Sequence, residues 1–477
     1  MIDTMSAEHK NTTFQPITPS IAAEMRRLVG EEHFFTTDAV LHDCGHDETE
    51  DLLFLPEAVV QPGNTAEVSA LMALCTQERI PVTVRGGGSG LAGGALPVYG
   101  GLVMHMKRFD RILDIDERNA QVRVEPGVVT EVLQQAVREK GLFYPPDPSS
   151  RGWSFIGGNV GTNAGGPKAV KYGVVKDHVL NLEVVLPTGE VVWTGANTLK
   201  NSTGYNLTQL MVGSEGTLGV VTQIVLKLQP HPTHNLLLLA PFFSADSACA
   251  AVAAIFQAGV TPSALEFMER NAIDWVLRYL GDVAIPVADA VQAHLLIEVD
   301  GFHPDSLYAD CAKIQEVLDH FDCGEVLFAD DEATKVDLWR MRRNVAHAVK
   351  NNSVYKEEDT VVPRAELPRL LQGVKAIGAQ YGFESVCYGH AGDGNLHVNI
   401  LRGDLTEQHW LAEVPKGIRE IFELVKSLGG TLSGEHGVGY VQKPYMDVFF
   451  GETEMRLMRG IKAVFDPAGI LNPGKVF

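Results

Sequence analysis

The stretch "RGGGSGLAGGALPVYGG", residues 85–101, decides between two ways of binding a nucleotide cofactor. It matches the dinucleotide pattern G-x-G-x-x-G over residues 88–93 and follows the strand-like "IPVTV". In a Rossmann fold this motif also opens a helix, whose first turn holds the pyrophosphate. Here a proline and two further glycines follow, and no helix can begin among them. The sequence therefore argues against a nicotinamide-binding Rossmann domain.

Two more glycine-rich stretches lie downstream, "GGNVGTNAGGP" at 157–167 and "GSEGTLG" at 213–219. Glycine costs backbone entropy, so such clusters mark turns or places where the backbone approaches a ligand closely. Exposed amides in these turns form concave anion sites that suit a pyrophosphate. The alternative is three tight loops without a ligand. Three stretches together favour the ligand.

Bulk properties narrow the class of protein. The 477 residues predict two or three domains, with 45% hydrophobic and 21% charged residues as in ordinary globular chains. A net charge of −21 argues against nucleic acid as a partner. No stretch approaches the roughly 20 apolar residues of a transmembrane segment. Six scattered cysteines without a C-x-x-C motif predict reduced thiols and a cytoplasmic protein, with no iron–sulfur cluster.

The order of predicted elements divides the chain. A helical lead-in covers 1–50, and residues 51–230 mix helices and strands, including a helix after Asn64 and a meander of "GLVMHM", "RILDID" and "AQVRVEPG". Two successive β-α-β units begin near residue 235. They predict a ferredoxin-like antiparallel sheet with helices on one face, within a domain at 231–450. A helix and tail, 451–477, end the chain.

A second motif, "GHAGDGNLH" at 389–397, places two histidines around a turn. If Asp393-Gly394 forms a two-residue type I′ turn, His390 lies opposite His397 with Cβ atoms about 4.5–5.5 Å apart. Two imidazoles at that separation can share a cation, and Glu435 in "SGEHGVG" could supply a third ligand. The alternative is a pair of stacked histidines beside an unrelated glycine turn.

Together with "TGYNLTQLMVGSEGTLGVVT" and "FDPAGILNPGK", these motifs resemble those of the flavin-linked D-2-hydroxyacid dehydrogenases. That family lies in the vanillyl-alcohol oxidase/para-cresol methylhydroxylase superfamily. It includes D-lactate dehydrogenases, glycolate oxidase flavin subunits and D-2-hydroxyglutarate dehydrogenases. The resemblance runs from about residue 35 to the end. It implies an α+β fold in which a two-subdomain FAD-binding domain of the para-cresol methylhydroxylase type is joined to the ferredoxin-like cap, with the tail returning to the flavin.

The resemblance also implies the cofactor contacts. FAD is expected to be non-covalent, because Ser89 stands where superfamily members with linked flavin carry a histidine. The matching cofactor positions are Arg85, Gly86, Gly87, Gly88, Ser89, Gly90, Pro146, Gly157, Gly158, Asn159, Thr162, Asn163, Gly165, Gly166, Tyr172, Glu215, Gly216, Val220 and Asn472.

At the reacting end, the family pattern maps a divalent metal onto His390, His397 and Glu435, zinc being favoured over manganese or iron, and the catalytic base onto His436. The substrate-binding positions that it implies are Arg342, Lys356 and Asn399. The 2-hydroxyglutarate enzymes carry a threonine four residues after the arginine, where this chain has Ala346. The segment before "VVP" is also about one residue longer than the family pattern. Both departures favour a small substrate.

The sequence thus predicts an FAD-dependent dehydrogenase that oxidises a small D-2-hydroxy acid, D-lactate favoured, to the 2-oxo acid. Glycolate or D-2-hydroxyglutarate is the alternative substrate. A metal-dependent hydrolase would leave the glycine stretches unexplained, and a non-catalytic flavin-binding subunit should lack the histidine hairpin. The sequence leaves open whether a quinone, a cytochrome, an electron-transferring flavoprotein or oxygen is the electron acceptor, and whether the protein is a homodimer.

Overall fold

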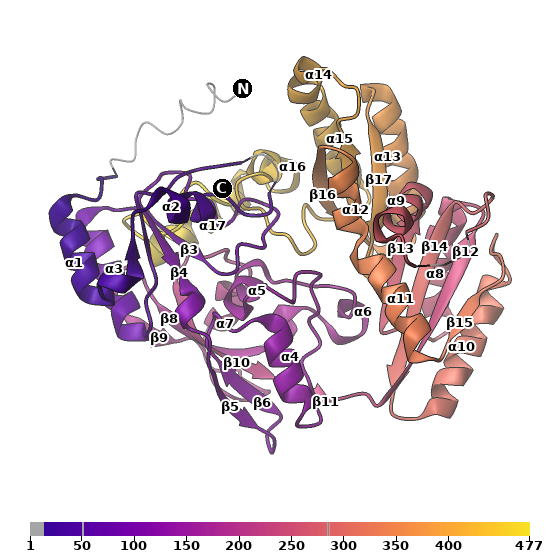
Figure 1. Ribbon diagram of the computed structural model, residues 1–477, viewed down its shortest axis with the longest axis horizontal. Helices are drawn as coiled ribbons and strands as arrows, with labels where there is room; N and C mark the ends of the chain where they lie inside the picture. Colours follow the sequence, from indigo (N-terminus) through magenta and orange to yellow (C-terminus); the bar gives the residue numbers. More distant parts are fainter. Residues whose placement is uncertain (1–13, 50–51, 284, 286) are drawn as a thin grey trace.

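The computed structural model describes residues 14–49, 52–283, 285 and 287–477. Figure 1 shows two halves side by side, an N-terminal region and a cap region. The N-terminal region contains a four-stranded, a five-stranded and a two-stranded sheet, and the cap region contains one seven-stranded sheet. The first 13 residues of the predicted helical lead-in, and its predicted end at 50–51, lie outside the described residues. No helix in the described part of the chain combines the length and the apolar character needed to cross a membrane. All six cysteines are free thiols, as expected.

The first sheet has the order β1-β2-β4-β3, and β2, β3 and β4 run parallel. Asn64 caps α3 by accepting the Glu67 backbone N–H, as predicted, and α3 buries its apolar face against this sheet. The lead-in belongs to the same layer, because β1 pairs with β2. The elements are α1 (Pro19–Val29), β1 (Phe34–Phe35), α2 (Asp38–Cys44), β2 (Ala58–Val60), α3 (Thr65–Glu78), β3 (Val82–Arg85) and β4 (Leu102–His105).

The second sheet is antiparallel, in the order β5-β6-β10-β8-β9. The predicted meander is therefore wrong in its first strand. Leu102, Val103 and Met104 of β4 are all buried, which suits a parallel strand covered on both faces. The elements are β5 (Ile112–Asp116), β6 (Gln121–Val124), α4 (Thr130–Arg138), β7 (Leu142–Phe143), α5 (Ile156–Thr162), α6 (Ala169–Tyr172), β8 (Val179–Val185), β9 (Val191–Trp193), α7 (Leu207–Met211), β10 (Val220–Lys227) and β11 (Gln229–Pro230).

The cap sheet has the order β15-β12-β14-β13-β17-β18-β16, and every pairing is antiparallel. The four strands β15-β12-β14-β13 come from the two predicted β-α-β units and confirm the ferredoxin-like prediction. The strands are β12 (His234–Phe242), β13 (Ala264–Glu269), β14 (Ala293–Gly301), β15 (Leu327–Ala329), β16 (Tyr355–Val361), β17 (Glu384–Gly389) and β18 (Asn395–Leu401).

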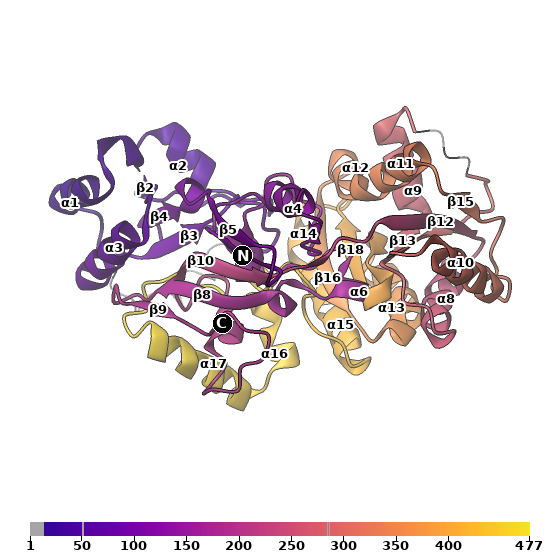
Figure 2. The ribbon, with the colours of Figure 1, turned by 90° about the horizontal axis from the view of Figure 1, so that it is seen from below.

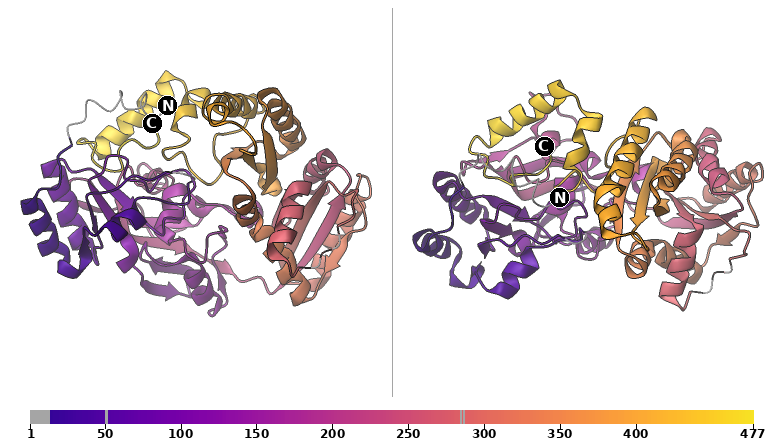
Figure 3. Two further views of the ribbon diagram at one scale, coloured as in Figure 1. Left: turned by 45° about the horizontal axis from the view of Figure 1, so that its top comes forward. Right: turned by 90° about the horizontal axis from the view of Figure 1, so that it is seen from above.

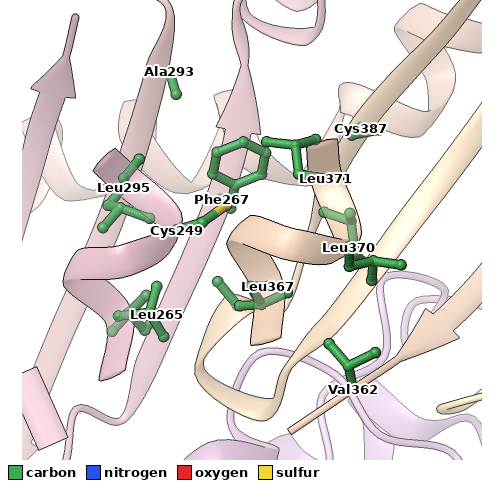
Figure 4. Packing of buried hydrophobic residues seen from close by; sticks show 14 of the residues in the cluster. Cys249, Leu265, Phe267, Ala293, Leu295, Val362, Leu367, Leu370, Leu371 and Cys387 are labelled. Carbon is green, nitrogen blue, oxygen red and sulfur yellow. The ribbon is translucent and has the colours of Figure 1, made fainter. Parts of the chain in front are cut away.

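Helices cover both faces of this sheet, so the prediction of one covered face is wrong. Alternate residues of β12 show why, since Leu236 and Leu238 pack in one core and Leu237 and Leu239 in another. Figure 4 shows the first core, where Phe267 and Leu265 of β13 meet Cys249 and Leu371. That face carries α8 (Ala245–Gln257), α10 (Pro304–Leu318), α13 (Leu367–Tyr381) and α15 (Val414–Ser427). The opposite face carries α9 (Arg270–Leu280), α11 (Glu332–Arg343) and α12 (Val345–Asn352).

The C-terminal segment returns from the cap to the N-terminal region (yellow in Figures 2 and 3). After α14 (Glu407–Ala412), α15, α16 (Met446–Phe449) and α17 (Glu452–Phe465), Leu471 pairs with Val82 at the edge of β3. Asn472 follows, and its backbone N–H donates to the Val82 carbonyl at 2.7 Å. The tail therefore reaches the glycine-rich loops of the N-terminal region, as expected.

Candidate active site

A cavity lies between the N-terminal region and the cap sheet. One wall consists of the three predicted glycine stretches, including α5 and the turn before β10. The other wall is the face of the cap sheet that bears α11 and α12, at strands β16, β17 and β18. The two walls combine backbone amides on one side with titratable side chains on the other.

Two glycines show how the first wall is built. A Cβ on Gly86 would lie 3.6 Å from the Cα of Gly158, so two glycine stretches approach within van der Waals contact. A Cβ on Gly158 would meet no atom within 4 Å, because this position faces the cavity. A side chain there would fill space that a ligand could occupy. The predicted cofactor residues that line the cavity are Gly86, Gly87, Gly88, Ser89, Gly90, Gly157, Gly158, Asn159, Thr162, Glu215 and Gly216.

The structure does not bring the remaining predicted cofactor residues to the cavity lining. Four of these side chains have protein partners, and one of them is Asn163, whose Oδ1 accepts the Lys176 backbone N–H at 2.8 Å. Arg85 donates to the His46 carbonyl at 2.7 Å, the Tyr172 hydroxyl donates to Asp300 at 2.7 Å, and the Asn472 amide donates to the Glu215 carbonyl at 2.8 Å. A Cβ on Gly165 would lie 3.0 Å from Glu435 Oε2. The residues of this group are Arg85, Pro146, Asn163, Gly165, Gly166, Tyr172, Val220 and Asn472.

The histidine hairpin forms, but its predicted register is wrong. Tyr388, and not His390, lies opposite His397 across β17 and β18. The connection spans residues 390–394 and contains a 3₁₀ turn. A type I′ turn needs positive φ at both central residues. Only Gly394 has it, at +77°, while Asp393 does not. His390 therefore leaves the strand and reaches the site from the loop.

The predicted metal ligands nevertheless converge. His390 Nε2 lies 3.2 Å and His397 Nε2 lies 3.6 Å from Glu435 Oε1, and one ligand atom of each residue falls within 4.8 Å of the others. The rings of His390 and His397 are nearly perpendicular, with centroids 5.5 Å apart. His436, the predicted base, stacks on His397 at 5.2 Å. All four residues line the cavity.

Carboxylates dominate the electrostatics of this cluster. Burial lowers the pKa of His390, but Glu266 and Glu435 outweigh it and raise that pKa to about 10. Burial likewise opposes ionisation of Glu435, yet His390 and the neighbouring imidazoles lower its pKa. Burial is the main reason that the pKa of His397 falls to about 3. A protonated His390 thus places a positive charge between the carboxylates of Glu266 and Glu435.

Glu266 on β13 contacts this cluster, and the sequence reasoning missed it. It is fully buried, and His390 Nδ1 lies 2.8 Å from its Oε2. Arg342 Nη2, from α11, lies 2.7 Å from the same oxygen. A carboxylate that accepts from Nδ1–H fixes the imidazole tautomer, so that Nε2 faces Glu435. Arg342 lines the cavity as predicted, but it is already paired with Glu266.

Strand β16 places Glu357, and not Lys356, at the cavity. Tyr355 and Glu357 line it, and Glu357 Oε1 is 3.4 Å from His397 Nδ1. Lys356 points to the opposite face of the sheet, where its ammonium lies over the Trp410 ring at 5.2 Å. Successive side chains of a strand alternate between faces, so Lys356 cannot share the face of its neighbours. Its predicted contact with substrate is therefore not supported.

Asn399 lies on the same face of β18 as His397, as predicted, but it is fully buried and is not part of the cavity lining. Its side-chain amide makes no hydrogen bond of ordinary geometry within the described residues, and neither does the hydroxyl of the neighbouring Tyr388. Tyr388 does line the cavity, with the Arg342 guanidinium 5.3 Å from its ring. The cap wall therefore offers a buried hydroxyl that the sequence reasoning missed.

A glycine-walled cavity that ends on histidines and carboxylates of an antiparallel cap sheet is the arrangement expected of one class, a two-domain flavoprotein oxidoreductase. Comparison with protein families agrees with this class. The model described as "FAD binding domain" matches residues 56–195, and the model "FAD linked oxidases, C-terminal domain" matches residues 231–476. The chain belongs to the FAD-linked oxidase family.

Curated relatives support this membership over the full length. The glycolate oxidase subunit GlcD of Bacillus subtilis is 39% identical over 464 residues, covering 97% of both chains. The D-lactate dehydrogenase of Anaerostipes hadrus is 36% identical and covers 97% of this chain and 98% of its own. The D-2-hydroxyglutarate dehydrogenase of Stutzerimonas stutzeri is 33% identical, over 96% and 99%. The family resemblance found in the sequence is confirmed.

Solved structures confirm the fold class. p-Cresol methylhydroxylase with substrate bound matches with a TM-score of 0.78 at 17% identity, covering 95% of each chain. The 4-ethylphenol oxidase of Gulosibacter chungangensis matches with a TM-score of 0.75 at 20% identity, covering 95% of this chain and 96% of its own. These similarities show the para-cresol methylhydroxylase type of fold.

Proposed function

We propose that this protein is an FAD-dependent dehydrogenase that oxidises a small D-2-hydroxy acid, with D-lactate as the favoured substrate, to the 2-oxo acid. The observation that carries the proposal is the cluster of His390, His397, Glu435 and His436 at the end of a cavity walled by the glycine stretches. The relatives named for D-lactate, glycolate and D-2-hydroxyglutarate span the substrate range to be tested.

The N-terminal wall fits FAD. Gly158 leaves open space where any other residue would place a Cβ, and the residues that would hold the flavin are those of the glycine stretches that line the cavity. FAD held by these residues would supply the hydride-accepting chemistry that oxidation of a hydroxy acid needs. Ser89 lines the cavity and offers no imidazole for a covalent link, which supports non-covalent binding.

The cap wall fits a divalent cation. Two imidazoles and one carboxylate are an established zinc donor set that keeps a coordination position open, although manganese or iron would also accept these donors. His390 carries a proton between Glu266 and Glu435, a positive charge that a cation would replace. A cation held by His390, His397 and Glu435 would act as a Lewis acid toward the substrate hydroxyl.

His436 would act as the general base. Its Nε2 is the nitrogen nearer Glu435, 4.0 Å from Oε1, and would accept the proton of the substrate hydroxyl. Burial opposes a charged imidazole, but Asp359 and Glu357 outweigh it and raise the pKa of His436. The two carboxylates would therefore stabilise the imidazolium once the proton has moved.

Glu357 supports a monocarboxylate substrate. Arg342 lines the cavity with its guanidinium on Glu266 and would contact the substrate carboxylate as well, whereas Glu357 would repel a second carboxylate close to the metal candidates. Ala346 lines the same cavity without a hydroxyl. These features favour D-lactate or glycolate over D-2-hydroxyglutarate.

The six free thiols support a reducing compartment such as the cytoplasm.

Anaerobic reduction of the purified yellow protein tests the proposal. D-lactate, glycolate, D-malate and D-2-hydroxyglutarate are added in turn, and loss of the flavin absorbance is followed. We expect D-lactate to bleach the flavin fastest and L-lactate to leave it oxidised. A yellow protein that none of the four acids reduces would contradict the proposal and favour a non-catalytic flavin-binding subunit.

A further inference from the structure

The segment Ser433–Gly439, which carries Glu435 and His436, has no regular secondary structure, yet one buried carboxylate organises its first half. Asp359 Oδ2 accepts the backbone N–H groups of Gly434, Glu435 and His436 at 2.8, 2.8 and 2.9 Å. It also accepts the Ser433 hydroxyl at 2.7 Å. Three successive amides converge on one oxygen, as in the backbone nests that bind anions.

A second carboxylate holds the other half of this segment from across the cavity. Glu215, in the turn before β10 of the N-terminal region, accepts the backbone N–H of Val438 at 2.8 Å on Oε1 and that of Gly439 at 2.7 Å on Oε2. A Cβ on Gly437 would lie 2.9 Å from the Glu215 carboxyl carbon, so only glycine permits this approach. Glu215 itself has a φ of +52°, and Asn472 donates to its carbonyl.

We propose that Asp359 and Glu215 are positioning residues: two carboxylates, one from each region, hold the 433–439 segment so that Glu435 and His436 face the cavity beside His390 and His397. This inference rests on the proposed function for its consequence at the metal site. It assigns Glu215 a role beyond lining the flavin wall, since its carboxylate ties the N-terminal region to the segment that carries the base.

The geometry explains why the segment needs both carboxylates. Gly437 and Gly439 have φ of +84° and +52°, so the backbone turns sharply after His436 and makes no helical or sheet ladder there. Without the Asp359 carboxylate, the part-buried amides of Glu435 and His436 lose their acceptor, and that of Gly434 keeps only the Asp359 backbone carbonyl at 3.2 Å. Without the Glu215 carboxylate, the amides of Val438 and Gly439 lose theirs. Asn or Gln keeps the size but presents an N–H₂ group in place of one oxygen.

Hydrogen exchange of the full-length, FAD-loaded protein tests directly whether the two carboxylates hold the 433–439 segment. We expect Asp359→Asn to raise amide exchange at 434–436 and Glu215→Gln to raise it at 438–439, in each case by at least about tenfold. Two matched controls remove buried carboxylates that do not touch the segment. Glu269→Gln releases Lys375 in the cap, and Glu125→Gln releases Arg111 in the N-terminal region. Neither control should change exchange at 434–439. Unchanged exchange in both test variants would overturn the proposal, and a cooperative thermal unfolding transition in every variant shows that they fold.

Zinc titration of chelator-treated protein then tests the positioning role. Asp359 Oδ1 also lies 3.7 Å from His397 Nδ1, but Glu215 contacts the 433–439 segment only through backbone N–H groups. We expect each single variant to bind Zn²⁺ about tenfold more weakly, a typical effect of an outer-shell partner. The double variant should lose about ten- to thirtyfold and not the hundredfold product, because both carboxylates hold one segment.

The two experiments separate the possible failures. Raised exchange with unchanged Zn²⁺ affinity would show that the carboxylates hold the segment without positioning its ligands, and would overturn the inference. Losses that multiply fully in the double variant would also contradict a shared segment. A wild-type protein that binds no Zn²⁺ refutes the metal part of the proposed function, while the exchange at 434–439 still decides whether the two carboxylates hold the base.

Discussion

Replacing Glu266 with glutamine tests how far the metal candidates depend on a residue that touches no substrate. Its carboxylate accepts from His390 Nδ1 and pairs with Arg342, both of them buried. Glutamine keeps the size but removes the charge. We expect Zn²⁺ affinity to fall about 10- to 100-fold, the usual effect of losing the carboxylate behind a ligating histidine. That range corresponds to about 1.4–2.8 kcal/mol.

Stability should fall as well, by a separate mechanism. Arg342 has a side chain only 5% exposed and would lose its buried counter-charge. Breaking a buried ion pair from one side costs about 3–5 kcal/mol. The double variant Glu266→Gln/Arg342→Met removes both charges, so its free energy of unfolding should recover to within about 1–2 kcal/mol of wild type. Its Zn²⁺ affinity should stay low, because His390 still lacks the carboxylate.

Competition with a chromophoric chelator measures the affinity, and urea unfolding of the same FAD-loaded preparations measures the stability. Arg342→Met alone is the matched control, since it leaves the contact between Glu266 and His390 intact and should bind Zn²⁺ nearly as wild type does. If Glu266→Gln binds Zn²⁺ as tightly as wild type, Glu266 does not orient His390. If the double variant regains affinity, the loss came from Arg342 and the reasoning is refuted.

Four further predictions follow from the site and from strand β16. His436→Ala should retain FAD while reduction of the flavin by D-lactate slows by about 10²–10⁴-fold, the usual contribution of a general base; unchanged anaerobic bleaching would contradict this role. Lys356→Ala should change kcat/KM for D-lactate less than about threefold, because its ammonium lies over Trp410 on the far face; a large rise in KM would show that it reaches the substrate. Glu357→Gln should raise kcat/KM for D-malate relative to D-lactate by about tenfold, since one like-charge contact is removed; an unchanged ratio would remove Glu357 as a selector. Burial raises the pKa of Glu358 to about 7 from 4.5, so the folded state keeps a proton that the unfolded state releases. Stability should therefore fall as pH rises from 4.5 to 7, by roughly 3 kcal/mol, and Glu358→Gln should abolish this fall; parallel stability–pH curves would contradict it.

Local sequence patterns predicted elements well where one helix or strand decides its own structure. The Asn64 cap fixes the start of α3, and Val68, Leu71, Met72 and Cys75 are buried as their spacing predicts. The two β-α-β units give the strand order expected of a ferredoxin-like sheet. Helices on the second face were missed, because α9 occupies the connection between β13 and β14 and no local signal states which face it covers.

The metal candidates were found although their predicted pairing was wrong. The turn holds five residues where the sequence reasoning assumed two, so His390 no longer faces His397 across the ladder. The imidazoles still meet, because His390 leaves the strand on the face toward which His397 points. The types of residue in the motif were therefore better evidence than the register, which depends on backbone angles that Asp393 does not adopt.

The sequence contains some evidence for the three supporting carboxylates, Glu266, Asp359 and Glu215. Glu266 stands between the apolar pairs "AL" and "FM" of the strand "ALEFM", residues 264–268, where an unpaired charge would be costly, so a buried partner was implied. Asp359 and Glu215 gave a weaker signal, because their partners are backbone amides of a segment 75 or more residues away in the chain. A sequence pattern does not show which backbone amides lie outside helices and sheets and therefore need a side-chain acceptor.

Strand β16 shows how one residue of register changes the chemistry. "YKEEDTV" carries a lysine and three acids in succession, and alternation divides them into two sets. One register points Lys356 and Glu358 at the cavity, and the other points Tyr355, Glu357 and Asp359 there. Pairing of Asp359 with His397 across β18 selects the second. The cavity therefore presents a carboxylate beside the metal candidates where the family pattern suggested an ammonium, and this reversal of charge is one reason that we propose a monocarboxylate substrate.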